Sequence, residues 1–199
     1  MVELLKYYTV FGLLSPITFT ALWIAAALLE PSWVLGNNSL SDLGICGNPS
    51  AEVCFNMGCM LAGMFALIFD LGLLRKKGEF CAIGVIMFVG VIALAGVGVM
   101  NLNYGYAHQA TATLYAICAY ISMILSLIAD IKGRKVFYWV VTAVLVFLCI
   151  GADIQFTFEG FEPIGISCTL IWVTTQAIKF MREEGIDGRK IVAEGVMTD

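Results

Sequence analysis

Six long apolar stretches constrain what this chain can fold into. They cover residues 7–29, 53–74, 80–100, 109–129, 136–154 and 164–181. An α-helix needs about 20 apolar residues to cross the hydrocarbon core of a bilayer, and these stretches are apolar on nearly all sides rather than on one face. The pattern predicts an all-α, polytopic membrane protein, in which six transmembrane helices form one membrane domain over residues 1–199.

The composition leads to the same expectation. Only 13% of the residues are charged, whereas soluble domains carry about 25%. Membrane lipids are therefore the expected surroundings. The formal net charge of −4 leaves no basic face to neutralise phosphates, which argues against a nucleic-acid partner. The sequence does not fix an oligomeric state, and a homo-oligomer stays open.

The basic residues predict the orientation of the bundle. All of them fall at alternate ends of the six stretches, in four groups: Lys6; Arg75, Lys76 and Lys77; Lys132, Arg134 and Lys135; and Lys179, Arg182, Arg189 and Lys190. The positive-inside rule then places both termini and a tail, residues 182–199, in the cytoplasm of a multi-pass cell-membrane protein. Asp70 and Asp130 lie near the same ends, where we expect water and neighbouring basic residues to solvate and pair them.

Polar residues gather in the three connections expected on the outer side. Those that we predict to form an outward-facing ligand pocket are Asn38, Ser41, Asp42, Asn101, Asn103, His108, Asp153 and Glu159. Glu162 falls in the connection before the sixth stretch. An ordinary wetted rim is the alternative, in which Ser41 and Asp42 cap a short helix in the loop.

His108 is the one imidazole in the chain, and it sets the catalytic options. A carboxylate beside it, from Asp42 or Asp153, would favour its protonated form and make it an acid–base group. Ser41 is then a candidate nucleophile, although no nucleophile-elbow motif surrounds it. A zinc site of the three-ligand type usually draws on several histidines, so no metal and no cofactor is expected.

Two of the seven cysteines, Cys46 and Cys54, are expected in the outer connection that follows the first stretch. Disulfides persist on that side of a membrane, and Gly47, Asn48 and Pro49 between the two cysteines can turn the chain. A Cys46–Cys54 disulfide is therefore a candidate. Asn37 begins an N-glycosylation sequon in the same connection, and its use stays open.

The run Asn37-Asn38-Ser39-Leu40-Ser41-Asp42-Leu43-Gly44 resembles a signature that follows the first helix in a prokaryotic six-helix membrane family, catalogued as domain of unknown function 998. Phe55-Asn56, Gly58, Gly63 and His108 are similar to later features of that family. The resemblance covers almost the whole chain. It implies the six-helix layout, which is distantly similar to that of DRAM and Sfk-like proteins linked to lipid handling, and it transfers no catalytic residue.

Three classes of function fit this sequence. The first is a protein that binds or carries a lipid or small amphiphile at the outer pocket. The alternative is a membrane-embedded hydrolase or transferase that uses His108 with Asp42 or Asp153. A transporter or channel ranks third, because only Pro16 interrupts a stretch and no charge is evident at mid-membrane.

Overall fold

Six long helices make up the computed structural model, which describes the backbone of residues 2–196 and the side chains of residues 7–183. The helices are α1 (Val2–Leu29), α2 (Pro49–Leu73), α3 (Glu79–Val99), α4 (Tyr106–Lys132), α5 (Val136–Gln155) and α6 (Phe158–Val196). Two short 3₁₀ helices, η1 (Leu40–Gly44) and η2 (Leu102–Tyr104), lie in the connections. The predicted all-α fold with six membrane-length helices is confirmed.

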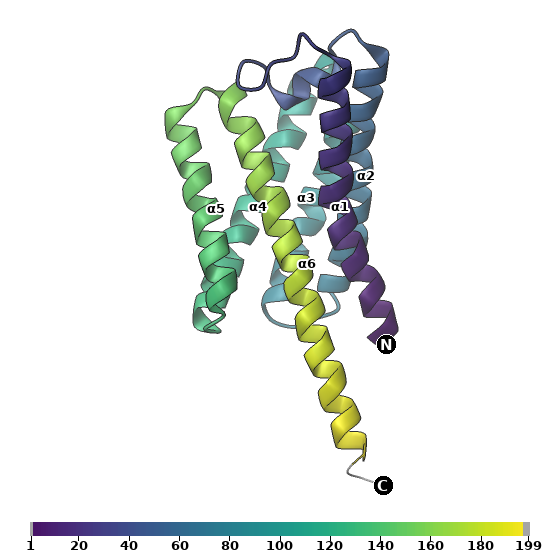
Figure 1. Ribbon diagram of the computed structural model, residues 1–199, viewed down its shortest axis with the longest axis vertical. Coiled ribbons are helices and arrows are strands. Elements are labelled where there is room, and N and C mark those ends of the chain that lie inside the picture. The colour runs from purple at the N-terminus through teal and green to yellow at the C-terminus, as the bar shows by residue number, and fades with distance from the viewer. Residues whose placement is uncertain (1, 197–199) are drawn as a thin grey trace.

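The helices form a ring in chain order (Figure 1). Each helix packs against the next, and α6 closes the ring against α1. The two termini lie at one end, together with the connections 74–78 and 133–135, and we call it the terminal end. The connections 30–48, 100–105 and 156–157 lie at the other end, which we call the long-loop end.

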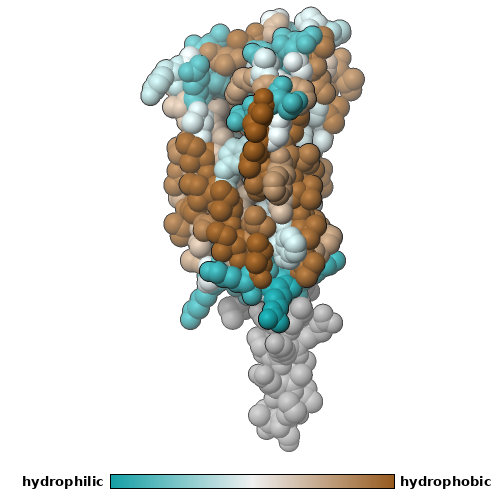
Figure 2. Space-filling model, turned by 90° about the vertical axis from the view of Figure 1, so that its left-hand side faces the viewer, coloured by the Kyte–Doolittle hydropathy of each residue, from teal (hydrophilic) through white to brown (hydrophobic). Residues whose placement is uncertain are grey.

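The surface between these ends is apolar. Figure 2 shows a brown belt across the middle of the molecule, with hydrophilic residues gathered above and below it. Large apolar side chains such as Leu28, Phe147 and Ile154 are more than 70% exposed, which in water would be a severe penalty. All six helices are long and apolar enough to cross a bilayer. The chain is an integral, multi-pass membrane protein.

Small residues bring the helices close together. A Cβ on Gly63 of α2 would lie 2.7 Å from the backbone nitrogen of Ala95 on α3, so only glycine fits there. Such close contacts replace the hydrophobic driving force that helices lack in lipid. On the α1 side, the Ser15 hydroxyl donates a hydrogen bond to the Ala62 carbonyl oxygen over 2.9 Å. The helix continues through Pro16.

The sixth helix differs most from its predicted boundaries. It begins at Phe158 rather than at residue 164, so Glu162 is helical and not part of a loop. Its backbone continues as helix to Val196. The side chains of Lys6 and of most of the predicted tail, including Arg189 and Lys190, lie outside the described residues.

Candidate functional site

Asp42 and Ser39 close a capping box at the start of η1. The Ser39 hydroxyl oxygen accepts a hydrogen bond from the Asp42 amide at 3.2 Å, and Asp42 Oδ2 accepts one from the Ser39 amide at 2.8 Å. This reciprocal pattern satisfies two amides that the short helix would otherwise leave without partners. The Asp42 carboxylate is therefore engaged in local structure.

Glu162 of α6 holds η1 against the bundle. Its Oε2 accepts the Leu40 amide hydrogen at 2.7 Å, and its Oε1 accepts the Ser41 hydroxyl hydrogen at 3.0 Å. Hydrogen bonds to an ionised carboxylate are among the stronger ones in proteins. Ser41 is thus a buried donor to Glu162. The sequence did not single out Glu162, because it placed this residue in a connection rather than on a helix facing η1.

The asparagines predicted to line the pocket stabilise turns. Asn38 Oδ1 accepts the Val34 amide hydrogen at 3.0 Å. Asn101 Oδ1 accepts the Asn103 amide hydrogen at 3.2 Å, while the side chain of Asn103 is exposed. These bonds engage the side-chain oxygens of Asn38 and Asn101 in local structure. The rim of caps and turns therefore describes these residues better than an open polar pocket does.

His108 is buried at the start of α4, with 3% of its surface exposed. Its Nδ1 lies 2.8 Å from the Met100 carbonyl oxygen, and because a carbonyl only accepts, Nδ1 carries the hydrogen. No ion pair links this ring to a carboxylate among the side chains of residues 7–183. Asp153 is exposed on α5, and Glu159 lies in the first turn of α6. Neither Asp42 nor Asp153 forms an ion pair with His108 among the described side chains.

The disulfide between Cys46 and Cys54 is not formed. Both residues are free thiols, and Cys46 Sγ points toward the Asn48 carbonyl oxygen at 3.9 Å. Asn48 caps α2 and Pro49 begins it, so Cys54 lies in the second turn of that helix, past the turn of the chain.

Asn37, which begins the sequon, is exposed at the long-loop end. Within the described part of the chain, no group of three or more His, Cys, Asp or Glu residues is arranged to hold a metal ion.

A groove of about 560 Å³ lies on the side of the bundle formed by α1, α5 and α6, next to the connection 30–48. We define the groove by its lining side chains and glycines: Trp23, Leu35, Gly36, Asn37, Leu145, Leu148, Phe156, Thr157, Gly160, Pro163, Ile164, Ser167, Cys168 and Ile171. They come from α1, α5, α6 and the connections at the long-loop end. Leu148 and Ile171 are exposed, so the groove opens toward lipid.

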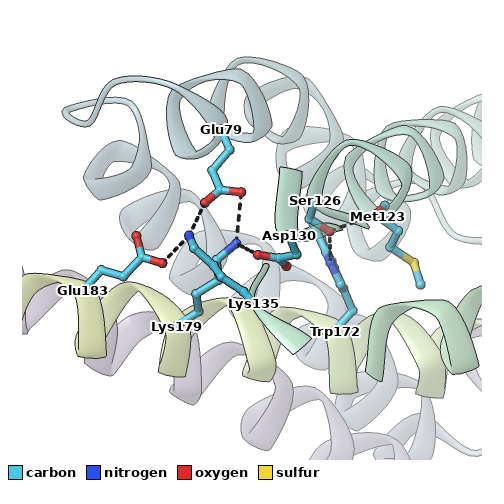
Figure 3. Close-up of polar contacts among 8 residues, drawn as sticks. All are labelled: Glu79, Met123, Ser126, Asp130, Lys135, Trp172, Lys179 and Glu183. Carbon is cyan, nitrogen blue, oxygen red and sulfur yellow. Dashed lines mark hydrogen bonds and ion pairs between the residues drawn. The ribbon is translucent and has the colours of Figure 1, made fainter. Parts of the chain in front are cut away.

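Five charged residues meet at the terminal end and form what we call the charged cluster: Glu79, Asp130, Lys135, Lys179 and Glu183 (Figure 3). Lys179 Nζ lies 2.6 Å from Asp130 Oδ1 and 3.1 Å from Glu79 Oε2. Lys135 Nζ lies 2.7 Å from Glu79 Oε1 and 2.6 Å from Glu183 Oε1. The cluster thereby joins α3, α4, α6 and the connection 133–135.

The expectation that Asp70 and Asp130 are solvated at the membrane surface is wrong. Asp130 and Lys179 are both 0% exposed, and Asp70 is 1% exposed. Asp130 pairs with Lys179 across the ring rather than with the basic residues that follow it in sequence. Side chains at the end of an apolar stretch look interfacial in sequence, but here the neighbouring helices cover them.

Lys135 lies outside the membrane-spanning helices, in the connection between α4 and α5, at the exposed side of the cluster. Burial alone would lower its pKa, but hydrogen bonds to Glu183 and Glu79 outweigh burial and raise the pKa of Lys135 above its ordinary value. The side chain of Lys135 is therefore protonated and positively charged at neutral pH. Because it contacts two carboxylates, it neutralises part of the negative charge that surrounds Lys179.

Further polar groups line the interior next to the cluster. Trp172 Nε1 donates to the Ser126 hydroxyl oxygen at 2.9 Å, and Ser126 donates to the Met123 carbonyl oxygen. The side chains of Ser122, Thr142 and Gln176 are buried, and their polar atoms have no hydrogen-bond partner. Buried groups of this kind usually bind water, an ion or a ligand. Polar groups are therefore interspersed with the apolar core in the half of the interior near the terminal end.

Comparison with known proteins identifies a family. A family model described as protein of unknown function (DUF998) matches residues 13–179, which is most of the chain. The match includes η1, His108, the lining of the groove and Lys179 with its partners Glu79 and Asp130. No curated protein and no solved structure matches the chain.

Proposed function

We propose that this chain, which belongs to the DUF998 family of proteins of unknown function, binds an amphiphile in the groove. The acyl chain of a single-chain lipid would lie between α5 and α6, and its headgroup would lie at the long-loop end. The groove itself carries this proposal. Its volume of about 560 Å³ is in the range of roughly 300–1,000 Å³ typical of ligand pockets, which are mostly apolar with a few polar groups.

The order of residues along the groove suits an amphiphile. Leu145, Leu148 and Ile171 form its apolar part, whereas Asn37 and Thr157 lie in the connections at the long-loop end. An acyl chain that enters from the bilayer gains van der Waals contacts with these side chains, which is the main attraction available between apolar groups in lipid. The polar residues remain available to a headgroup near the membrane surface.

The first connection forms the roof of the groove, and Glu162 supports it. Leu35, Gly36 and Asn37 line the groove a few residues before η1, which Glu162 binds through Leu40 and Ser41. Trp33, in the same connection, donates to the Ser39 carbonyl oxygen at 2.7 Å. These contacts hold the roof in place without a ligand, and a preformed site avoids part of the entropy cost of binding.

We further propose that the terminal end faces the cytoplasm and that the protein resides in the cell membrane. The support is the positive-inside rule, since the connections 74–78 and 133–135 carry the basic residues and those at the long-loop end carry none. Single-cysteine reporters in a cysteine-free background test this orientation. A reporter at Asn103 should react with an impermeant maleimide added to intact cells, and one at Lys77 should react only after lysis. The reverse pattern would overturn the orientation.

Photolabelling tests the groove. A fatty acid with a diazirine near its methyl end, added to protein in nanodiscs, should label the groove residues of α5 and α6 far more than other lipid-facing positions. Ser167→Trp fills the groove from an exposed position and should reduce that labelling by about tenfold, which corresponds to roughly 1.4 kcal/mol of binding free energy.

Ile124→Trp is the matched control, because Ile124 is an exposed residue of α4 outside the groove. It should leave the labelling unchanged. Labelling that is spread evenly over all lipid-facing residues, or that is insensitive to Ser167→Trp, would reject the proposal. The hydrolase alternative gains no support, since it needs a carboxylate beside His108 and no ion pair joins His108 to Asp42 or Asp153 among the described side chains.

A further inference from the structure

The charged cluster forms a continuous chain of contacts from the surface to the interior. At its outer end the side chains of Glu183 and Lys135 are 35% and 30% exposed, and Glu79 is 17% exposed. At its inner end Lys179 and Asp130 are fully buried. Every step along this chain is between 2.6 and 3.1 Å, which is within the reach of a hydrogen bond. Figure 3 shows the chain as a bent line of alternating carboxylate and ammonium groups.

The charges of this cluster do not balance. It contains three carboxylates, from Glu79, Asp130 and Glu183, and two ammonium groups, from Lys135 and Lys179. If all five groups are ionised, one negative charge is left over at the edge of a membrane interior. An uncompensated charge in such surroundings is expensive, and the usual remedy is to neutralise it. One added proton makes the cluster neutral.

Asp130 is the carboxylate best placed to take this proton. Glu79 is partly exposed and contacts both ammonium groups, whereas Asp130 is fully buried and contacts one. Asp130 Oδ2 is buried and has no hydrogen-bond partner. The ammonium of Lys179 touches both carboxylates but has no well-angled hydrogen bond to either. The inner pair is thus incompletely satisfied in its ionised form.

We propose that the charged cluster is a proton-binding site, open to the terminal end, at which Asp130 takes up one proton. In this step a hydronium ion at the terminal face gives up its proton through Glu183, Lys135, Glu79 and Lys179, each passing on one proton and receiving another. A new O–H bond forms on Asp130 Oδ1, the oxygen that Lys179 Nζ contacts at 2.6 Å, and water is left at the surface. Lys179 loses one proton to Asp130 and regains one from Glu79, so it is charged again at the end of the step and then pairs with Glu79 alone.

Proton binding acts on the packing of α6. Asp130 on α4 faces Lys179 on α6, Glu79 on α3, Lys135 in the connection and the phenol of Tyr138 on α5, whose ring lies 5.8 Å from Lys179 Nζ. Once Asp130 is neutral, its ionic attraction to Lys179 ends. The contact between α4 and α6 at the terminal end then weakens, so proton binding loosens the packing of α6 against α4. This inference stands on the charged cluster and does not depend on the groove.

Infrared spectroscopy tests the site directly, because a protonated carboxyl and a carboxylate absorb at different frequencies. We expect the wild-type protein in nanodiscs to show a carboxyl band that grows as the pH falls. Asp130→Asn should remove this band. Asp153→Asn, which alters an exposed aspartate at the long-loop end, is the matched control and should keep it. Asp70 is also buried without a partner for either carboxyl oxygen and can give a carboxyl band of its own. The Asp130 band is therefore the one that Asp130→Asn removes and Asp70→Asn keeps, because no ion pair joins Asp70 to the cluster among the described side chains.

A second variant covers the case in which Asp130→Asn does not fold. In Lys179→Met Asp130 loses the one ammonium group in direct contact with it, so the carboxyl band should be present at every pH tested and should no longer titrate. The proposal would be overturned if Asp130→Asn removed no titrating carboxyl band, if every titrating band disappeared in Asp70→Asn, or if the Asp130 band still titrated in Lys179→Met. The absence of any titrating carboxyl band in the wild type would also overturn it.

Discussion

Lys179→Met is the substitution that most sharply tests the buried charged cluster. In the wild type the Lys179 ammonium lies 2.6 Å from Asp130, and neither side chain is exposed. Methionine has a similar length, so the change removes the charge while filling most of the space. Asp130 is then left in an apolar interior without a cation, where its neutral, protonated form costs the least free energy.

The expected loss of stability follows from the cost of that proton. The ordinary pKa of aspartate is about 3.9, so protonating the residue at pH 7 costs roughly 3 pH units at 1.36 kcal/mol each, or about 4 kcal/mol. This value agrees with the roughly 3–5 kcal/mol seen when one partner of a buried ion pair is removed. In Lys179→Met the folded protein keeps a proton that the unfolded protein releases above its pKa. Stability of the variant should therefore fall by about 1.4 kcal/mol per pH unit as the pH rises.

Unfolding in mixed micelles of increasing SDS content, followed by circular dichroism, measures these differences. Lys179→Met should lose about 4 kcal/mol at pH 7 and only about 1.5 kcal/mol at pH 5. Lys132→Met, at an exposed lysine at the end of α4, should change stability by less than about 0.5 kcal/mol. Lys179→Met with Asp130→Leu should recover most of the loss, since an apolar pair often replaces a buried ion pair without penalty. A penalty below about 1 kcal/mol that does not vary with pH would refute the reasoning, because that is the value for a solvated surface pair.

Three further outcomes follow from the structure. Glu162→Gln should weaken the hold on η1 by about 2 kcal/mol and speed hydrogen exchange at the Leu40 amide by about 30-fold, whereas Glu159→Gln should not. The raised pKa of Lys135 means that its contribution to stability is fully present below its ordinary pKa and is lost as the pH rises through the raised one, so alkaline unfolding curves of wild type and Lys135→Met should converge. Cys46 and Cys54 should both react with an alkylating reagent in the unreduced protein under denaturing conditions, and mass spectrometry showing a bridged peptide would contradict the free thiols.

The fold was predictable because its signals are local. An apolar stretch of the right length must be helical in lipid, where every backbone polar group needs a partner within its own segment. The polar long-loop end was recognised as well. Ser39 and Asp42 have the spacing of a capping box, and this spacing favoured the alternative of a capped rim that the sequence left open.

The charged cluster was missed because it depends on contacts across the ring. In sequence Lys179 looks like one more basic residue at the end of a stretch, and Asp130 looks like its counterpart on another helix. Burial arises only when α3, α4 and α6 pack together. A signal was nevertheless present: Ser122, Ser126 and Asp130 are spaced by four residues, which places them on one face of an otherwise apolar helix. Such polar stripes inside membrane helices point to an interior site.

The interior of the ring also decides what the proposed proton site can do. At the terminal end polar groups are buried among apolar side chains such as Phe80 and Phe180, whereas the half near the long-loop end contains a second apolar cluster. A proton that reaches Asp130 therefore has no continuous row of polar groups, among the described side chains, along which to leave at the other end. It must return to the side from which it came, as expected of a regulatory or coupling site and not of a proton channel.

We expect proteoliposomes that contain the protein and an internal pH-sensitive dye to leak protons no faster than empty liposomes after a pH jump, while the infrared carboxyl band still titrates. Proton flux that Asp130→Asn abolishes would show instead that a polar path crosses the apolar half.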